Sequence, residues 1–267
     1  MYYVDYHMHS KYSCDGCEEV STICEAAISR NVKEIAITDH YDTYEDQTRE
    51  DVVDLEGLYR DILAAREVYK DKLQIKFGVE IGQSHFNLTN EQKLLKTYPF
   101  DFVIGSVHNL NDTFDMGKCD YTQTKIEPLY DEYLDALITL AQKGDFDAMG
   151  HITYPVRYCY SQTKHYPSFA PFKEKIEYLY KELIKRDRGI EINCSGYFQS
   201  LQRPMPDLEL VTFYKECGGK ILTIGCDSHH RDTVGISLKQ GMEVVKEAGF
   251  TEITTFTKRI PTFIKIA

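Results

Sequence analysis

The feature that most constrains the fold of this 267-residue chain is an alternation of short apolar runs with longer amphipathic stretches. Runs rich in β-branched and aromatic residues predict seven strands, at residues 2–7, 34–38, 74–79, 102–106, 146–150, 189–193 and 220–226. Helical spacing of apolar residues occurs between them, at residues 18–30, 51–69, 126–141, 169–183 and 234–248. This alternation predicts parallel βα units closed into an α/β barrel, with residues 1–267 as a single domain.

Three longer segments follow predicted strand ends, at residues 84–90, 109–125 and 154–168. We expect them to be loops that build the active face of the barrel, because the loops after barrel strands have that role. The tail, residues 251–267, contains β-branched and aromatic residues, and we expect it to pack over one end of the barrel.

Composition and charge exclude several classes of protein. A net charge of −11 argues against nucleic acid as a partner, because phosphate contacts need a basic surface. A mean hydropathy of −0.41 and the absence of a long apolar run argue against a membrane partner. No signal peptide is recognised, so we expect a cytoplasmic protein whose eight cysteines are reduced. Cys14 and Cys17 form a CxxC pair, but no second pair completes a zinc knuckle.

Histidines and carboxylates gather where the predicted strands end. The carboxylates are Asp39, Glu80 and Asp227, and the histidines are seven of the nine in the chain: His7, His9, His40, His108, His151, His229 and His230. One histidine in an apolar run is usually a core residue, but seven at one face of a barrel indicate a shared metal site. Within it, residues two apart on a strand point to the same side, so His7 and His9 can share one ion.

The number of candidate ligands exceeds what one ion needs, because a catalytic zinc usually takes about three protein ligands. We therefore expect two or three ions, with a carboxylate such as Glu80 bridging them. Multinuclear sites suit phosphoryl chemistry, since the ions hold phosphate oxygens and activate a water molecule.

The motifs resemble those of the PHP (polymerase and histidinol phosphatase) family. They are His7-x-His9, TDH at 38–40, Glu80, the SVH ending at His108, GH at 150–151, DSH at 227–229 and KRIP at 258–261. The chain looks most like the stand-alone histidinol-phosphate phosphatase branch, because HSKYSCDG at 9–16 places Asp15 where many other members have histidine. This resemblance implies a distorted (β/α)7 TIM-like barrel with a trinuclear site.

The resemblance also implies which residues hold each of three divalent ions (zinc, manganese or iron). The first ion would take His7, His9, Glu80 and Asp227. The second would take Asp15, His40 and His229, and the third Glu80, His108 and His151.

Four further residues receive roles from the resemblance. Arg157 matches the phosphate-binding arginine of the family. His230 and Asp42 match a proton relay to the leaving alkoxide, and an alternative role for both is to orient metal ligands. A second arginine that usually follows the EIN-x-SG motif is absent after INCSG at 192–196, so either Arg203 reaches the phosphate or the substrate pocket differs.

The implied function is a metal-dependent phosphomonoesterase that hydrolyses L-histidinol phosphate in histidine biosynthesis, by attack of a metal-bridging hydroxide. The expected partner is a small phosphorylated substrate. The same ligand set also fits a phosphatase for another small phosphate ester or for phosphotyrosine. An exonuclease of this family, disfavoured by the net charge, and a non-catalytic metal-binding protein are the remaining alternatives.

Overall fold

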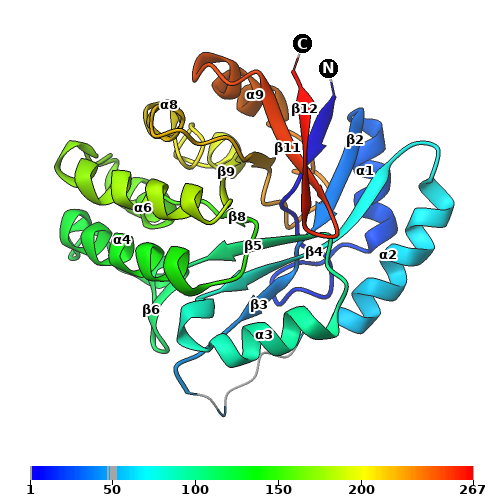
Figure 1. Cartoon of the computed structure of the whole chain (residues 1–267), viewed down its shortest axis with the longest axis horizontal. Coiled ribbons are helices and arrows are strands. Elements are labelled where there is room, and N and C mark those ends of the chain that lie inside the picture. Colours follow the sequence, from blue (N-terminus) through cyan, green and yellow to red (C-terminus); the bar gives the residue numbers. More distant parts are fainter. Residues whose placement is uncertain (1, 47, 49–52, 267) are drawn as a thin grey trace.

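A ring of parallel strands forms the centre of the computed structural model, which describes residues 2–46, 48 and 53–266 (Figure 1). The hydrogen-bonded order is β1-β2-β4-β5-β8-β9-β10, and β3 pairs with the second half of β4. These strands are β1 Tyr3–Asp5, β2 Val32–Ile37, β3 His40–Asp42, β4 Gln74–Gly82, β5 Phe102–Ser106, β8 Ala148–Met149, β9 Gly189–Asn193 and β10 Leu222–Gly225. Because β2 and β3 occupy successive parts of one position beside β4, the ring has the seven positions that the sequence predicts.

The ring is closed between its first and last strands by backbone hydrogen bonds just beyond the regular strands. Tyr6 N donates to Ile224 O at 2.8 Å, and Asp227 N donates to His7 O at 2.7 Å. The predicted strand at 2–7 is therefore regular only to Asp5, but its pairing continues to the first histidine. Inside the barrel, the side chains of Tyr6 and Phe102 pack together, with 5.0 Å between the centroids of their aromatic rings. The expectation of a distorted (β/α)7 barrel is confirmed.

Helices cover the outside of the ring (Figure 1). They are α1 Val20–Ser29, α2 Leu55–Tyr69, α3 Leu88–Thr97, α4 Ile126–Lys143, α5 Tyr154–Thr163, α6 Lys173–Lys185, α7 Ser195–Phe198, α8 Leu208–Glu216 and α9 Leu238–Glu247. Acidic N-caps begin two of them, since the side chains of Asp54 and Asp207 accept from Gly57 N and Leu210 N. The first residues of the predicted helix at 51–69, residues 51 and 52, lie outside the described residues.

The segments predicted as loops contain regular structure, so that prediction is wrong in detail. The first contains a 3-10 turn, Ser84–Phe86, and the start of α3. The second forms a hairpin of β6 Asn109–Asn111 and β7 Phe114–Asp115, followed by a turn at Met116–Lys118. The third is mostly helix α5, whose first turn contains Pro155, a residue that the first turn of a helix accepts.

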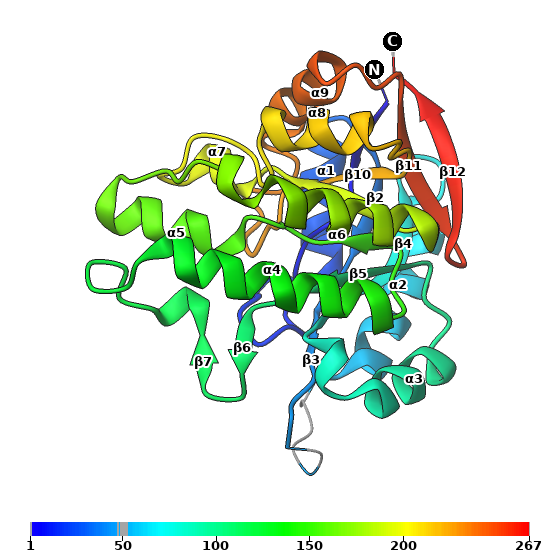
Figure 2. The same cartoon turned by 60° about the vertical axis from the view of Figure 1, so that its left-hand side comes forward.

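The tail forms a β-hairpin of β11 Glu252–Thr257 and β12 Ile260–Lys265. The turn of this hairpin lies at the amino-terminal ends of the barrel strands. Arg259 N donates to Asp101 O at 2.8 Å, just before β5, and Arg259 Nε lies 3.1 Å from Asp147 Oδ1, just before β8. The expectation that the tail packs over a barrel end is confirmed for the described residues, and Ala267 lies outside them. Figure 2 shows this hairpin and the β6–β7 hairpin at opposite sides of the molecule.

None of the helices that the structure describes combines the length and apolar character needed to cross a membrane.

Candidate metal centre

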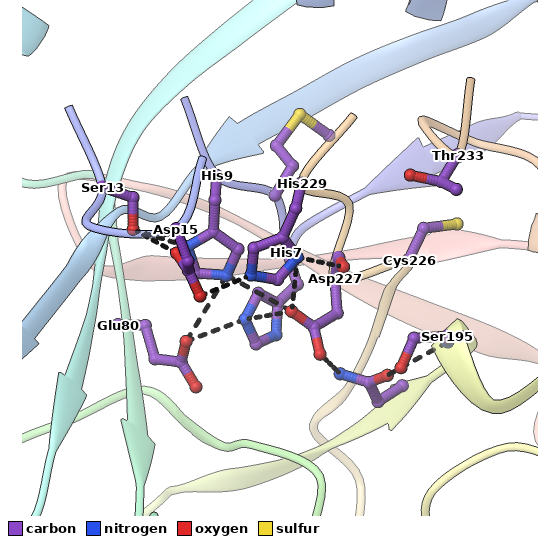
Figure 3. A network of polar contacts seen from close by, with 12 residues as sticks. His7, His9, Ser13, Asp15, Glu80, Ser195, Cys226, Asp227, His229 and Thr233 are labelled. Atoms are coloured by element: carbon purple, nitrogen blue, oxygen red, sulfur yellow. Dashed lines mark hydrogen bonds and ion pairs between the residues drawn. The ribbon is translucent and has the colours of Figure 1, made fainter. Parts of the chain in front are cut away.

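The nine predicted metal ligands meet at the carboxyl ends of the strands, around the side chain of Glu80. Figure 3 shows six of them, His7, His9, Asp15, Glu80, Asp227 and His229. Glu80 lies within β4 and is fully buried, and its neighbours come from every side of the ring. The nine side chains predicted as ligands are His7, His9, Asp15, His40, Glu80, His108, His151, Asp227 and His229. Residues separated by more than two hundred positions in sequence therefore share one site, as the parallel topology requires.

The first predicted ligand group is the deepest. His7 Nε2 lies 3.0 Å from Glu80 Oε2, and His9 Nε2 lies 3.6 Å from the same oxygen. Asp227 Oδ1 completes the group, at 3.3 Å from His9 Nε2 and 3.6 Å from His7 Nε2. All four side chains are buried, and Nε2 of each histidine lies within 3.6 Å of both carboxylates.

The second group lies at the mouth of the site. Asp15 Oδ2 lies 2.9 Å from His229 Nε2 and 3.3 Å from His40 Nε2. His9 also falls within this group, since its ring stacks on those of His40 and His229 at 4.3 Å between centroids. The side chain of Asp15 is 46 % exposed, so this position is the most open to solvent of the three.

The third group is a triangle of donor atoms on the other side of Glu80. Glu80 Oε1 lies 2.9 Å from His151 Nε2 and 3.3 Å from His108 Nε2, and the two nitrogens lie 3.4 Å apart. The two oxygens of Glu80 therefore face different ligand groups, Oε2 the first and Oε1 the third. This is the geometry of a bridging carboxylate.

The imidazoles are oriented by acceptors on their outer nitrogens. His7 Nδ1 lies 2.7 Å from Glu191 Oε1, and His229 Nδ1 lies 3.0 Å from the carbonyl oxygen of Asp227. His108 Nδ1 lies 3.6 Å from Asp42 Oδ1. Such contacts fix the tautomer and direct Nε2 inward, as they do around metal-binding histidines in general.

Glu191 is a functional residue that the sequence argument missed. It lies in β9, is buried, and also accepts from His151 N at 2.9 Å through Oε2, so it supports ligands of two groups. A charged residue within a fully buried strand, GIEIN at 189–193, is the signal that could have identified it.

Two buried histidine nitrogens without a hydrogen-bond partner among the described residues indicate that these residues fit metal ions. His9 Nε2 and His40 Nδ1 are buried and make no hydrogen bond of acceptable geometry with the described residues, although both face carboxylates. An unpaired buried polar atom is costly, whereas a divalent ion between imidazole and carboxylate satisfies both. The donor set, imidazole with carboxylate, suits zinc, manganese or iron.

The electrostatics of the group agree with that fit. Burial alone would raise the pKa of the Glu80 carboxyl, but His7, His40 and His108 outweigh burial and hold it well below its usual range. Burial, together with neighbouring His40, lowers the pKa of His9 to about 3. Glu80 is thus ionised and His9 neutral at pH 7, which are the protonation states that bind metal. Burial would lower the pKa values of His7, His40 and His108, but neighbouring carboxylates outweigh it and raise them, so these imidazoles carry positive charge that a metal ion would replace.

A cavity of about 1080 Å³ opens over the ligand groups. Arg157, from helix α5 rather than a loop, lies in its lining and is mostly buried. Its Nη1 donates to Ser195 Oγ at 3.2 Å and lies 3.4 Å from Asp227 Oδ2, and its Nη2 donates to Tyr158 Oη at 2.8 Å. The guanidinium is therefore held next to the first ligand group.

The remaining predicted site residues lie in different places. Asp42 lines the cavity and contacts His108, as a residue that orients a ligand would. His230 is exposed at the rim, with Nδ1 3.1 Å from Cys17 Sγ, and is not part of the described cavity lining. Arg203 stacks on Tyr166 at 4.1 Å and pairs with Asp207 at 3.7 Å, also outside that lining.

The fold and the site together define a metal-dependent hydrolase with a (β/α)7 barrel. A family model described as PHP domain matches residues 5–195, and the chain belongs to the PHP domain family.

Two relatives extend the likeness over nearly the whole chain. A histidinol-phosphatase of Lactococcus lactis is 30% identical over 95% of this chain and 94% of its own. A probable histidinol-phosphatase of Thermotoga maritima is 24% identical over 97% of this chain and 98% of its own.

Solved structures show the same fold. A crystal structure of the Lactococcus lactis histidinol phosphate phosphatase with zinc, L-histidinol and phosphate gives a TM-score of 0.83 at 28% identity, covering 97% of this chain and 98% of the other. A structure of a histidinol phosphatase from Listeria monocytogenes, described as putative by those who solved it, gives a TM-score of 0.75 at 19% identity, over 89% and 99%.

Proposed function

We propose that this protein is a metal-dependent phosphomonoesterase that hydrolyses L-histidinol phosphate to L-histidinol and phosphate. The observation that carries the proposal is the placement of Glu80 between two histidine groups, on the floor of a cavity that also contains Arg157. The likeness to the histidinol-phosphatase of Lactococcus lactis over nearly the whole chain supports the choice of substrate.

Three divalent ions fit the described ligands best. Glu80 separates two of the positions, and Asp15, His40 and His229 form the third at the mouth. When bound, ions in such a site polarise phosphate oxygens and lower the pKa of a coordinated water toward ~7.

Arg157 binds the phosphate in this proposal. Its fork presents N–H donors beside Asp227, and a guanidinium matches the oxygens of a phosphate dianion. Tyr158 and Ser195 accept from the same guanidinium and limit its rotation. The residue thus orients the phosphorus atom and offsets its negative charge without supplying a proton.

His230 protonates the departing alkoxide, and Asp42 positions His108. His230 follows the ligand His229 directly and reaches the mouth by rotation away from Cys17. Asp42 lies in the cavity lining, but its contact with His108 gives it a positioning role. Arg203 has no part in the reaction as proposed, because Tyr166 and Asp207 engage it outside the lining.

The acidic wall of the cavity favours a substrate that carries a positive group. Asp112 and Asp115 line the cavity on the β6–β7 side, and the chain as a whole carries a charge of −11. An amino alcohol phosphate has an ammonium group that such carboxylates attract, whereas a polynucleotide is repelled.

A substrate panel tests the proposal. Purified, metal-loaded protein is assayed for phosphate release from L-histidinol phosphate, phosphotyrosine, other small monoesters and single-stranded DNA. We expect kcat/KM for L-histidinol phosphate to exceed the others by at least about 100-fold, which corresponds to ~2.7 kcal/mol. Preference for another monoester would reject the substrate and retain the reaction, and no hydrolysis of any ester would reject both.

A further inference from the structure

Three side chains meet at the rim of the barrel beside the ligand groups. Cys17 Sγ lies 3.1 Å from His230 Nδ1, and an oxygen of Glu18 lies within 4.8 Å of both atoms. Cys17 and His230 are exposed and Glu18 is partly exposed, so an ion from solvent reaches them without any rearrangement of the core.

Hydrogen bonds and an ion pair hold the two segments of this cluster together, and one of them uses an oxygen of Glu18 itself. Arg231 N donates to Glu18 Oε1 at 3.0 Å, and the ion pair between Asp15 and His229 at 2.9 Å joins the same two segments. The Glu18 carbonyl oxygen also accepts from Lys11 N at 2.8 Å. The three potential ligands are thus brought close before any ion binds, which reduces the entropic cost of binding one.

The donor types distinguish this cluster from the nine-residue site. Thiolate, imidazole and carboxylate are the three ligand classes of zinc, and three of them leave one coordination position for water. A thiolate favours soft cations over magnesium, calcium or manganese. The nine residues of the main site include no cysteine, so a thiolate ligand distinguishes an ion held by Cys17 from an ion held by those nine residues.

We propose that Cys17, Glu18 and His230 form an additional, peripheral metal site for a thiophilic divalent cation such as Zn²⁺ or Cd²⁺. Binding exchanges the thiol proton of Cys17 for the cation and uses Nδ1 of His230. Cys17 therefore pairs with a distant histidine rather than with Cys14, which lines the cavity instead.

Occupation of this site also affects hydrolysis, a consequence that rests on the proposed function. An ion on Nδ1 holds the His230 ring at the rim, so that the ring cannot rotate into the mouth to protonate the alkoxide. We therefore expect excess zinc to inhibit the enzyme through Cys17.

Cadmium binding to the metal-loaded holoprotein tests the site directly. Thiolate-to-cadmium charge transfer absorbs in the ultraviolet, and cadmium that exchanges into the cysteine-free main site gives no such band. We expect one equivalent of Cd²⁺ to develop the band in the wild type and in Cys14→Ser, an exposed cysteine three residues away that serves as the matched control. Cys17→Ser abolishes the band, and Glu18→Gln weakens cadmium binding at least about tenfold.

Two results would overturn the site: an undiminished band in Cys17→Ser, or an equal loss in Cys14→Ser. Inhibition is measured separately, as the zinc concentration that halves phosphate release. Cys17→Ser, which leaves the basal rate unchanged, should require at least about tenfold more zinc. A normal cadmium band with no difference in inhibition would keep the metal site and reject the role of His230 as proton donor.

Discussion

The two ends of the barrel place acidic side chains among different partners. At the amino-terminal end, Asp145 and Asp147 meet Arg188 and Arg259: Arg259 Nη2 lies 2.8 Å from Asp145 Oδ1, and Arg259 Nε lies 3.1 Å from Asp147 Oδ1. We call these four residues the arginine clamp. At the carboxyl end, carboxylates face imidazoles, and His9 Nε2 and His40 Nδ1 make no hydrogen bond with the described residues although both face carboxylates. Arg188 Nε in the arginine clamp also makes none with these residues, but the other nitrogens of that guanidinium pair with Asp145 and Asp147.

The comparison separates charges that the chain satisfies itself from charges that require an ion. In the arginine clamp, fixed guanidinium forks neutralise the carboxylates and join the tail hairpin to the strands. In the metal centre, Glu80 faces imidazoles whose pKa values its charge helps to raise despite burial, so they hold positive charge that a bound cation would replace. One end therefore stabilises the barrel, and we propose that the other performs the chemistry.

Glu80→Gln gives the largest expected effect, because it removes the bridging oxygen charge from two ligand groups. We expect activity to fall roughly 10³-fold and bound metal to decrease, with the far-ultraviolet circular dichroism unchanged. Metal content by elemental analysis and phosphate release measure this.

A matched control for Glu80→Gln is available in the same barrel. Glu34, in β2, is equally a buried carboxylate, but it contacts Tyr6 and Lys76 away from the metal centre. Glu34→Gln should leave metal content intact, and an equal loss of metal in both variants would contradict the assignment of Glu80.

Arg259→Met should lower the stability of the fold and leave activity and metal binding unchanged. It leaves Asp145 and Asp147 with one fewer cation, so we expect a loss of about 3 kcal/mol in the free energy of unfolding and a Tm lower by roughly 6–12 °C. The specific activity and metal content of the folded protein should not change. Calorimetry measures the change, and Arg60→Met, which replaces an exposed arginine paired with Asp61, is the control. A loss of metal in Arg259→Met would show instead that the two ends of the barrel are coupled.

Arg157→Lys tests the guanidinium fork at the carboxyl end of the barrel. Lysine keeps the charge but loses the planar fork, so we expect kcat/KM to fall roughly 30-fold, or ~2 kcal/mol, with Tm nearly unchanged. Arg203→Lys is the comparison, since Arg203 lies outside the described cavity lining, and it should change kcat/KM less than about twofold. Steady-state kinetics would refute this pairing if Arg203→Lys were the more damaging variant.

The smallest expected effect is the acid response of the arginine clamp. Burial works against ionisation of Asp145, but Arg259 and Arg188 outweigh it and lower the pKa of this carboxyl. A lowered folded-state pKa gives stability that is present above the unfolded pKa, about 3.9, and is lost as the pH falls through the folded pKa. Between pH 5 and pH 3, the free energy of unfolding, measured with urea, should therefore fall more for the wild type than for Asp145→Asn. The difference should be less than about 1 kcal/mol, because Asp145 is half exposed. An identical pH response in both proteins would contradict this.

Much of the metal centre could be predicted because barrel topology converts sequence position into spatial position. Once His7, Glu80, His108 and Asp227 are assigned to strand ends, parallel pairing brings them together regardless of their separation in sequence. The structure places all nine predicted ligands at one site, and their roles as ligands remain a prediction.

Residues whose role depends on side-chain direction could not be predicted in this way. Arg203 follows the INCSG motif closely but turns toward Tyr166 and Asp207, and His230 contacts Cys17 rather than the cavity. Helix α5 likewise replaces an expected loop, since packing on α4 and Pro155 in its first turn favour a helix over its weak apolar pattern.

The sequence by itself determined the seven-stranded α/β barrel and the histidines and carboxylates at its strand ends, because both follow from periodicity and from the direction of parallel strands. The family resemblance alone adds Asp15 to this set. Tertiary structure alone decided which oxygen of Glu80 faces which histidines, that Glu191 orients His7, and that the tail closes the opposite end through Arg259. These outcomes depend on rotamers and on contacts between distant segments, and local sequence patterns do not encode such distances.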